Sequence, residues 1–493
     1  AMLARAGRRT LVLEARDTPG GCAATEELWP GHFVDTGAHS LTALDPRVTP
    51  TGLEFVTPDP LVVALQPGGP SLAVSADPTR TASSIARFSE RDAAAWPRFM
   101  EAMERAGRVL EVLYRTPPPR VVGGDRGDLW ELARLALRLG RVGRADVVEL
   151  MRLVPMTVQE MLEEWFESDL LLGALAARGC RGIAQGPMAA GTAFVMIHGL
   201  IGGAGNPRAT RWVRGGLGRL GTTLERAARE AGAEIRTGAR VERILVDDGR
   251  ASGVALASGE VMRASVVASS ADPRHTLLEL VDPVHLDPEV HRQIRNIRFR
   301  GVCSKVHLAL DGLPEGPWDS FPPSLCVAPG IRYLERAWDD AKHGSPSRHP
   351  ALDVLVPTLL DPSLAPGGRH IASVLVQYTP HRRSDGEWDD VARDALTDSV
   401  VETLDACLPG LADRVVERHA YTPADLETRF GLTEGNIHHG EMTLDQILIG
   451  RPIAGFSRYA MPIEGLWACG AGAHPGGGLT GSPGMNASQA ILG

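Results

Sequence analysis

The chain opens on a helix, a glycine, a strand and an acid. Residues 1–6 (AMLARA) predict the end of an apolar helix, and Gly7 is a natural helix C-cap. The apolar stretch 9–13 (RTLVL) predicts a strand that leads into Glu14. This order is that of the second half of a dinucleotide-binding βαβ unit, in which the acid after the second strand binds the adenosine ribose. Any other α/β unit can carry the same order, so both interpretations stay open here.

A glycine loop that cradles a pyrophosphate belongs roughly 20 residues before such an acid. Only thirteen residues precede Glu14. We therefore expect the first strand and its GxGxxG loop to lie before residue 1, and we expect nucleotide affinity to collapse without them.

Two later stretches are rich in glycine. The pair Gly20–Gly21 follows Glu14 closely and lets backbone amides approach a phosphate, although an ordinary turn is the alternative. At the other end, 466–469 predicts a strand that enters a glycine-dense loop, and a helix is expected from about Pro483. The free N–H groups at such a helix end favour the negative charge that develops on a flavin ring on reduction. A low-complexity glycine loop is the alternative.

Length and composition bound the remaining possibilities. The 493 residues predict two or three domains, and 43% hydrophobic with 23% charged residues excludes a disordered or membrane-embedded chain. A net charge of −9 and only 5% aromatic residues argue against a nucleic-acid partner. The six cysteines are far apart and form no CxxC motif, which fits a reducing compartment, and the chain does not open like a secretory signal. We expect a cytoplasmic protein without a metal site.

Several stretches resemble one family of enzymes. The segments 14–21 (EARDTPGG), 212–260 and 468–488 (ACGAGAHPGGGLTGSPGMNAS) are similar to those of the FAD-dependent phytoene desaturase family. Two more, 361–380 and 430–452, resemble the branch of pyridine nucleotide-disulphide oxidoreductase domain-containing proteins within it. The resemblance covers essentially the whole chain and is more specific for the fold and FAD than for the substrate.

The resemblance implies an α/β fold: a Rossmann-like, amine-oxidase-like FAD-binding domain with an inserted α+β substrate domain. The FAD domain would consist of 1–75, 205–285 and 455–493. The substrate domain would consist of a helical part, 76–204, and a part with strands, 286–454. The residues expected to contact FAD are Glu14, Ala15, Arg16, Gly20, Gly21, Val241, Gly470, His474, Gly478, Thr480 and Met485.

The expected reaction is desaturation or oxidation of a largely apolar small molecule by hydride transfer to flavin N5, which requires few protein groups. Lys305 is one of only two lysines in the chain, and it shares a strand face with Cys303 and His307. In the wider amine-oxidase-like superfamily a lysine on a similar strand holds a water against flavin N5, so the resemblance makes Lys305 a candidate. A solvent-facing strand lysine is the alternative. His439 is a second candidate for the flavin-facing cavity, or else a turn histidine bonded to backbone.

Other positions carry weaker expectations. Cys22 stands where many desaturases have an arginine, so a phosphate or substrate contact of that arginine is in doubt for this chain. We expect Cys22 to be a small packed residue. The run 188–200 predicts a core helix or the lining of an apolar tunnel. The arginine-bearing amphipathic stretch 129–147 predicts either a solvated helix face or a peripheral contact with a membrane.

Two other functions use the same fold. A flavin oxidase of amines or amino acids would want an aromatic cage, which five tyrosines supply poorly. A non-catalytic lipid-binding protein would be free to lose the glycine motifs near the C-terminus, which this chain keeps. The electron acceptor (oxygen, quinone or nicotinamide) and the oligomeric state stay open.

Overall fold

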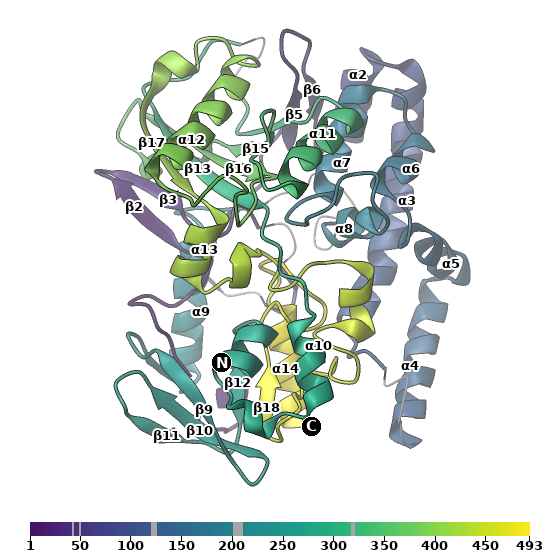
Figure 1. Cartoon of the computed structure of the whole chain (residues 1–493). Coiled ribbons are helices and arrows are strands. Elements are labelled where there is room, and N and C mark those ends of the chain that lie inside the picture. Colours follow the sequence, from purple (N-terminus) through teal and green to yellow (C-terminus); the bar gives the residue numbers. More distant parts are fainter. Residues whose placement is uncertain (42–43, 49–50, 120–125, 201–210, 317–320) are drawn as a thin grey trace.

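The computed structural model describes residues 1–41, 44–48, 51–119, 126–200, 211–316 and 321–493. Figure 1 shows the two chain termini together at one end of the molecule and a large sheet at the other. The elements around the termini form the part in which the sequence predicts a nucleotide-binding unit.

Short parallel strand pairs lie near the termini. Strand β1 (Leu11–Leu13) follows helix α1 (Met2–Arg5) and pairs in parallel with β8 (Glu234–Arg236). Strand β12 (Val267–Ser269) pairs in parallel with β18 (Leu466–Ala468). Parallel strands joined through helices are the arrangement that the opening pattern of the sequence predicts.

An antiparallel sheet stands beside these pairs. It consists of β9 (Val241–Asp247), β10 (Arg250–Leu256) and β11 (Val261–Arg263). The turn between β9 and β10 holds Asp248 at φ 50° and Gly249 at φ 78°. These positive φ angles are the ones that a tight hairpin turn requires, and they explain why Asp-Gly stands there.

The first and last helices meet. Helix α14 (Ser482–Leu492) contacts α1, where the Ser488 hydroxyl lies 3.0 Å from the Met2 sulfur. Helix α9 (Gly218–Glu230) approaches the turn after β1 so closely that a Cβ on Gly221 would lie 3.0 Å from the Gly20 Cα. The elements expected to form one nucleotide-binding unit therefore do assemble, although they are far apart in sequence.

The second part is built on a seven-stranded sheet. Its strand order is β17 (Val415–Tyr421), β13 (Cys303–Leu310), β16 (His370–Gln377), β15 (Ala351–Leu355), β14 (Ser324–Val327), β5 (Val62–Leu65) and β6 (Leu72–Val74). Only the β14–β5 pair is parallel. Every residue of β13, β14 and β5 is buried, because helices or loops cover both sheet faces. Residues 62–74 thus join the sheet of 286–454, whereas the sequence pattern groups them with the FAD domain; the other domain boundaries stay predictions.

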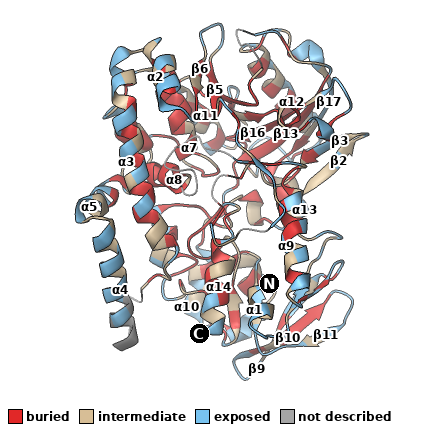
Figure 2. Cartoon of the chain, turned by 180° about the vertical axis from the view of Figure 1, so that it is seen from behind, coloured by how far each residue is buried: buried red, intermediate tan, exposed pale blue. Residues whose placement is uncertain are grey.

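Helices cover the sheet on both sides. On one face α12 (Asp390–Asp405) packs its apolar side chains against β13, β15 and β16. On the other face lie α7 (Asp169–Gly179) and α11 (Ile331–Lys342). Figure 2 shows buried residues concentrated in the sheet and in the inner helices.

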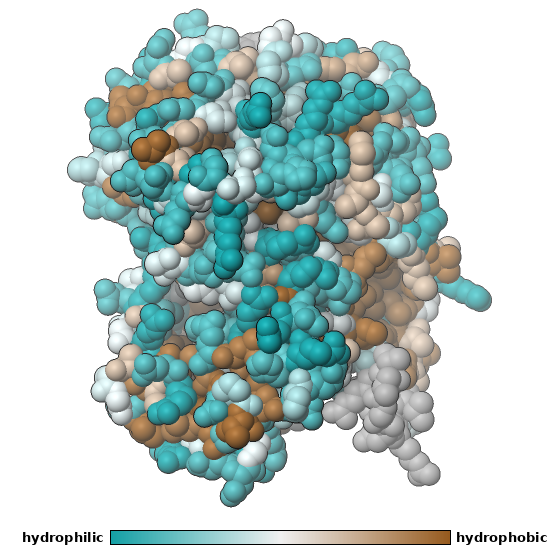
Figure 3. All heavy atoms as spheres, in the orientation of Figure 1, coloured by the Kyte–Doolittle hydropathy of each residue, from teal (hydrophilic) through white to brown (hydrophobic). Residues whose placement is uncertain are grey.

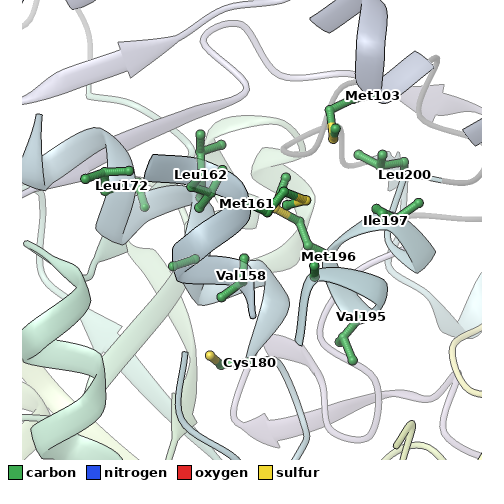
Figure 4. Close-up of a cluster of buried hydrophobic side chains, with 14 of the residues drawn as sticks. Met103, Val158, Met161, Leu162, Leu172, Cys180, Val195, Met196, Ile197 and Leu200 are labelled. Atoms are coloured by element: carbon green, nitrogen blue, oxygen red, sulfur yellow. The ribbon is translucent and has the colours of Figure 1, made fainter. Parts of the chain in front are cut away.

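A helical layer extends from α7. It includes α2 (Pro78–Ala86), α3 (Glu90–Tyr114), α4 (Arg126–Val142), α5 (Arg144–Leu153), α6 (Val158–Glu163) and α8 (Thr192–His198). Thr157 forms a capping box with Glu160 at the start of α6, which satisfies two otherwise free N–H groups. Figure 4 shows side chains of α3, α6 and α8, among them Met161 and Met196, meeting in a common apolar core. Helix α8 is buried along its whole length, as expected for a core helix.

Smaller elements complete the chain. These are β2 (Thr25–Trp29), β3 (His32–Asp35), β4 (Phe55–Val56), β7 (Trp212–Val213), α10 (Pro288–Arg295) and α13 (Pro423–Phe430). Among the described residues no helix combines the length and the apolar character needed to cross a bilayer.

Candidate functional site

The end of β1 is tied to the segment that leads into β9. The N–H of Ala239 donates to the Glu14 carbonyl and the N–H of Gly238 to the Arg16 carbonyl, at 2.8 and 3.0 Å. Val241, at the start of β9, therefore lies near the end of β1, and its contact with FAD stays a prediction. The half-buried Glu14 carboxylate accepts the N–H of Arg16 at 2.9 Å.

The turn after β1 needs its glycines for different reasons. Gly20 has φ +135°, and a Cβ there would lie 2.9 Å from the Ala23 carbonyl oxygen. Gly21 has φ +57° and open space around it, so its backbone stays accessible. The Arg16 guanidinium donates to the Gly21 carbonyl at 3.1 Å and to the Glu26 carboxylate at 2.6 Å. These two hydrogen bonds hold the turn after β1 in place.

Lys305 holds the two parts of the molecule together. Its side chain on β13 is 1% exposed, and its ammonium donates to the backbone carbonyls of Asp35 and Ala38. Burial lowers the pKa of Lys305 to about 8, although the carboxylate of Asp35 opposes the shift. Lys305 is therefore not a solvent-facing strand residue. The alternation of residue types in β13 suggests a half-exposed strand, but β16 and β17 flank it and loop 35–38 covers it.

Asp35 and Cys22 lie beside this lysine. The Asp35 carboxylate accepts from the Thr25 hydroxyl at 2.5 Å and from the Leu217 N–H at 2.8 Å. Burial raises the pKa of the Asp35 carboxyl, and it raises the pKa of the Cys22 thiol to about 11. The thiol is therefore protonated at neutral pH, which fits the expected packed residue and not a redox thiolate.

Several glycines in the loop between β18 and α14 have no space for a side chain. A Cβ on Gly470 would overlap the Ser270 carbonyl, and one on Gly477 would overlap His438. At the start of α14 the Thr480 carbonyl accepts the Asp45 N–H at 2.8 Å, and the Ser482 hydroxyl donates to Asp45 at 2.9 Å. The loop is therefore held in one path from strand to helix. Gly478 lies within it, and Met485 follows in the first turns of α14.

Neutral histidines surround this loop. His198 contacts the Tyr114 hydroxyl at 2.5 Å and the Gly477 carbonyl at 3.0 Å. His474 contacts the Leu113 carbonyl at 3.1 Å, and His438 the Arg181 carbonyl at 3.0 Å. Burial lowers the pKa of His198 and of His474 to about 4, so these rings are neutral at pH 7.

His439 is held close to the same loop. Its φ is +55°, its ring Nδ1 is buried with no hydrogen-bond partner among the described residues, and burial lowers its pKa. The buried guanidinium of Arg451 joins the two segments, because it donates to the carbonyls of His438 at 2.5 Å and Ala471 at 2.8 Å. The structure thus brings His439 close to the loop that carries His474, and Lys305 close to Cys22.

Arg451, Tyr114 and His198 are parts of this arrangement that the sequence pattern did not indicate. Arginine is so common in this chain that Arg451 carries no signal. Tyr114 lies on the buried face of the amphipathic helix α3, and His198 lies in the buried helix α8, where both positions are typical of core residues. Arg451 lies in the Arg-Pro pair that ends the 430–452 stretch, and that family resemblance is the nearest hint in the sequence.

The chain matches known proteins over its full length. The family model of flavin containing amine oxidoreductases matches residues 1–447. Pyridine nucleotide-disulfide oxidoreductase domain-containing protein 2 of Rattus norvegicus is 33% identical, over 100% of this chain and 90% of that protein. One of the subunits of the limonene dehydrogenase of Castellaniella defragrans is 27% identical (100% and 91%), and a lycopene-forming phytoene desaturase of Paracoccus sp. is 25% identical (97% and 91%).

A solved structure supports the fold. An oxidoreductase from Methanosarcina mazei superposes with a TM-score of 0.61 at 16% identity, over 99% of this chain and 95% of that one. The expected Rossmann-like, amine-oxidase-like fold is therefore confirmed, as is the resemblance to the FAD-dependent desaturase family.

The residues of this chain fit FAD. The glycine loop leads into the N-terminus of α14, and the backbone beside Gly21 is open. Within the part of the chain that the structure describes, the Nδ1 atoms of His439 and His474 are buried without a partner. These features offer N–H groups and ring nitrogens to a polar, anionic ligand. The individual contacts of the residues named from the sequence stay predictions, but FAD itself is the cofactor of the family. The chain belongs to the flavin containing amine oxidoreductase family and is an FAD-dependent oxidoreductase.

Proposed function

We propose that this oxidoreductase desaturates or oxidises a largely apolar small molecule. The observation that carries the proposal is a cavity beside the Lys305 region whose walls are mainly apolar, formed by α7, α11 and three strands of the large sheet. When bound, FAD supplies the acceptor for the hydrogen and electrons removed from a substrate carbon. Relatives named for limonene and phytoene, both hydrocarbons, support an apolar substrate.

Lys305 has two tasks in this proposal. Its ammonium holds loop 35–38 against β13 through two N–H groups, and a lysine ammonium has a third. In this proposal the third N–H would hold a water or take part in proton transfer. Because the pKa of Lys305 is about 8, the group can exchange a proton near neutral pH.

His439 would act through its neutral ring. A ring with a lowered pKa accepts or donates a hydrogen bond without bringing a charge next to an apolar substrate. We therefore propose that His439 lines the FAD-facing side of the site and orients ligands there, while Lys305 handles the proton.

Amine oxidation is a weaker candidate. An ammonium substrate would approach the cationic side chains Arg178 and Arg181, which line the cavity, and the nearby Lys305. Like charges in a buried site repel, so the cavity disfavours a cationic substrate.

The test uses the full-length, FAD-loaded protein without oxygen. Limonene, phytoene, decanoate and putrescine are added separately, and bleaching of the flavin absorption band is followed. We expect bleaching by one or more of the three largely apolar compounds. Bleaching by putrescine alone, or a protein that purifies without FAD, would overturn the proposal.

We also propose a peripheral contact with membranes through α4 and α5. Trp130, Leu137, Val148 and Met151 expose 59–70% of their surface on these two helices. Arg134, Arg138 and Arg141 stand on α4 beside them. Figure 3 shows apolar side chains gathered on the flank beside α5, and α4 lies along the outside of the molecule in Figure 2. Apolar and cationic groups together suit an anionic lipid surface.

A further inference from the structure

A buried arginine lies against the glycine loop between β18 and α14. Arg451 is 2% exposed and joins this loop to the 438–441 segment. Its guanidinium meets the loop at two points. Nε and Nη2 donate to the Ala471 carbonyl at 3.2 and 2.8 Å, and a Cβ on Gly476 would lie 3.5 Å from Nε. The positive charge of Arg451 is therefore fixed beside the loop that the sequence predicts for the flavin.

The hydrogen bonds of this guanidinium all go to backbone carbonyls. Nη1 donates to the carbonyls of Gly440 and Gln446, both at 3.2 Å, and Nη2 donates to that of His438 at 2.5 Å. Among the described residues no carboxylate oxygen lies within 4.0 Å of the guanidinium nitrogens. The donors of Arg451 are thus satisfied, but no neighbouring anion pairs with its charge.

Two buried carboxylates on adjacent segments have other partners. Glu441, whose side chain is fully buried, forms an ion pair with Arg300 at 2.6 and 2.8 Å. Asp272 is 1% exposed and accepts two backbone N–H groups and a threonine hydroxyl. It lies near the glycine loop, since a Cβ on Gly472 would be 3.5 Å from its Cα. Asp272 is therefore the carboxylate that can oppose the charge of Arg451 there.

The histidines around the loop show how far each charge reaches. Burial is the main cause of the lowered pKa of four rings, and in each the charge of Arg451 adds to the shift; these rings belong to His198, His438, His439 and His474. Among the four, Asp272 opposes the shift only in His439. At the other three rings the positive field of Arg451 is not offset by a described carboxylate.

A ring nitrogen without a partner lies on the same loop. His474 Nε2 donates to the Leu113 carbonyl at 3.1 Å, so in the neutral ring Nδ1 keeps a lone pair and carries no proton. Nδ1 is buried with no hydrogen-bond partner among the described residues. Helix α14 begins at Ser482, and the free N–H groups of its first turn add partial positive charge at the end of the loop. These features suit a ligand that brings an N–H group and negative charge.

We propose that the charge of Arg451 stabilises the negative charge that reduction places on the flavin ring, and so makes FAD in this protein easier to reduce. When a substrate loses two hydrogens, one leaves with both bonding electrons as a hydride to FAD and the other leaves as a proton to water, so the ring gains one negative charge. A fixed opposite charge in a buried site attracts it, because little water is present to screen the pair. The inference rests on FAD as the cofactor and does not depend on which substrate the protein oxidises.

The first test uses the wild-type, FAD-loaded protein. Its midpoint potential is measured between about pH 5 and 6 by anaerobic titration against a reference dye, with free FAD as the control. Free reduced FAD takes up a second proton in weak acid, so its potential approaches a change of about 59 mV per pH unit. A ring held as an anion takes up one proton for two electrons and changes by about 30 mV. We expect the smaller slope, and a slope near 59 mV for the protein would overturn the inference.

A second test separates the charge of Arg451 from its hydrogen bonds. Arg451→Gln removes the charge, whereas Arg451→Lys keeps it and loses most of the bonds to carbonyls. Arg451→Gln should lower the equilibrium constant for FAD reduction about tenfold or more, which is about 30 mV for two electrons, and Arg451→Lys should change it by less than about threefold. Both variants should lose stability in urea. Arg418→Gln, at an exposed arginine on β17, is the control and should change neither property. Equal shifts of potential in the Gln and Lys variants would reduce Arg451 to a structural role.

A third variant acts in the opposite direction and leaves Arg451 in place. Asp272→Asn removes the carboxylate that opposes Arg451 and should shift the equilibrium severalfold toward reduced FAD. A shift toward oxidised FAD contradicts the inference even if neither Arg451 variant folds. If the wild type shows the smaller slope but only putrescine bleaches its flavin, the proposed function fails alone. If an apolar compound reduces the flavin and the slope is near 59 mV, only the role of Arg451 fails.

Discussion

The ammonium of Lys305 donates a 2.7 Å hydrogen bond to the backbone carbonyl of Ala38, across 267 positions of sequence. The bond joins β13, next to the edge strand β17 of the large sheet, to the loop that follows β3. The same ammonium also binds the Asp35 carbonyl. One side chain therefore sets the spacing between the substrate sheet and the nucleotide-binding part.

Lys305→Met should reduce both stability and catalysis. The substitution leaves two buried carbonyls without a donor, which costs about 1–3 kcal/mol each. It also removes the proposed proton-transfer group, so flavin reduction by substrate should slow by about 10-fold to 100-fold. Denaturant unfolding and rapid-mixing absorbance measure the two effects. Lys342→Met is the control, because Lys342 is exposed and pairs with Asp339 in its own helix. If substrate reduces the FAD of Lys305→Met at the wild-type rate, the role of Lys305 is structural and not catalytic.

The lowered pKa of Lys305 predicts a pH dependence of stability. Between about pH 8 and the ordinary value of 10.5, the unfolded chain holds the proton on Lys305 and the folded chain does not. The unfolded state then binds more protons, so the free energy of unfolding rises with pH through this window. Relative to Lys305→Met, the wild type should gain up to about 3 kcal/mol between pH 8 and 10.5. Urea unfolding of both proteins at several pH values measures this gain, and parallel pH curves would contradict the buried-ammonium assignment.

Some of the fold is visible in the sequence because local patterns decide it. The Asp248–Gly249 turn, the strand that carries Lys305 (Cys303–Leu310) and the helix expected near the C-terminus all follow from turn chemistry and apolar runs. Residues 62–74 join the large sheet through the pairing of Val63 with Leu325, and no local pattern specifies a partner 262 positions away.

In the candidate site, too, local sequence patterns predict some features and long-range packing decides the others. The glycine stretches are visible because their backbone geometry demands glycine. The grouping of His39, Arg181 and Asp353 is not, because each residue comes from a separate segment and is ordinary within it. Arg181 is one of 49 arginines, so its residue type carried no information. Only the packing of α7 on the sheet gives these three side chains a common position.

Acid should destabilise the protein through its buried histidines. His198 and His474 have pKa values of about 4 in the folded protein, because burial disfavours the charged ring. Between pH 6.5 and about 4 the unfolded chain binds protons that the folded chain does not, so stability falls as the pH falls through this window. His198→Gln should lower the slope of the unfolding free energy against pH, because about one proton fewer is taken up on unfolding. His285→Gln, at an exposed position, should leave the slope unchanged; a similar flattening by both would show that burial is not the cause.

Membrane contact through α4 and α5 should depend on their exposed apolar side chains. Replacing Trp130, Leu137 and Met151 together with serine should lower binding to vesicles of phosphatidylglycerol and phosphatidylcholine by about 10-fold or more, because each side chain contributes buried apolar area. Cosedimentation measures the bound fraction, and added salt should weaken binding further if the α4 arginines take part. Val391→Ser is the control, because Val391 is 77% exposed on α12, away from this flank. Equal vesicle binding by all three proteins would remove α4 and α5 as the contact.

Gly470→Ala tests whether the glycine loop is shaped for the cofactor. A Cβ at this position would overlap the Ser270 carbonyl, so β18 must move away from β12 or the loop must change its path. We expect the variant to purify with less than about one tenth of the wild-type FAD content and to unfold at lower denaturant concentration, since overpacking costs about 1–3 kcal/mol. The matched control is Gly367→Ala, because that glycine has open space around it and no positive φ. FAD release by heat, followed by absorbance, gives the content of each protein. If Gly470→Ala keeps a full complement of FAD while losing stability, the loop supports the fold but does not hold the cofactor.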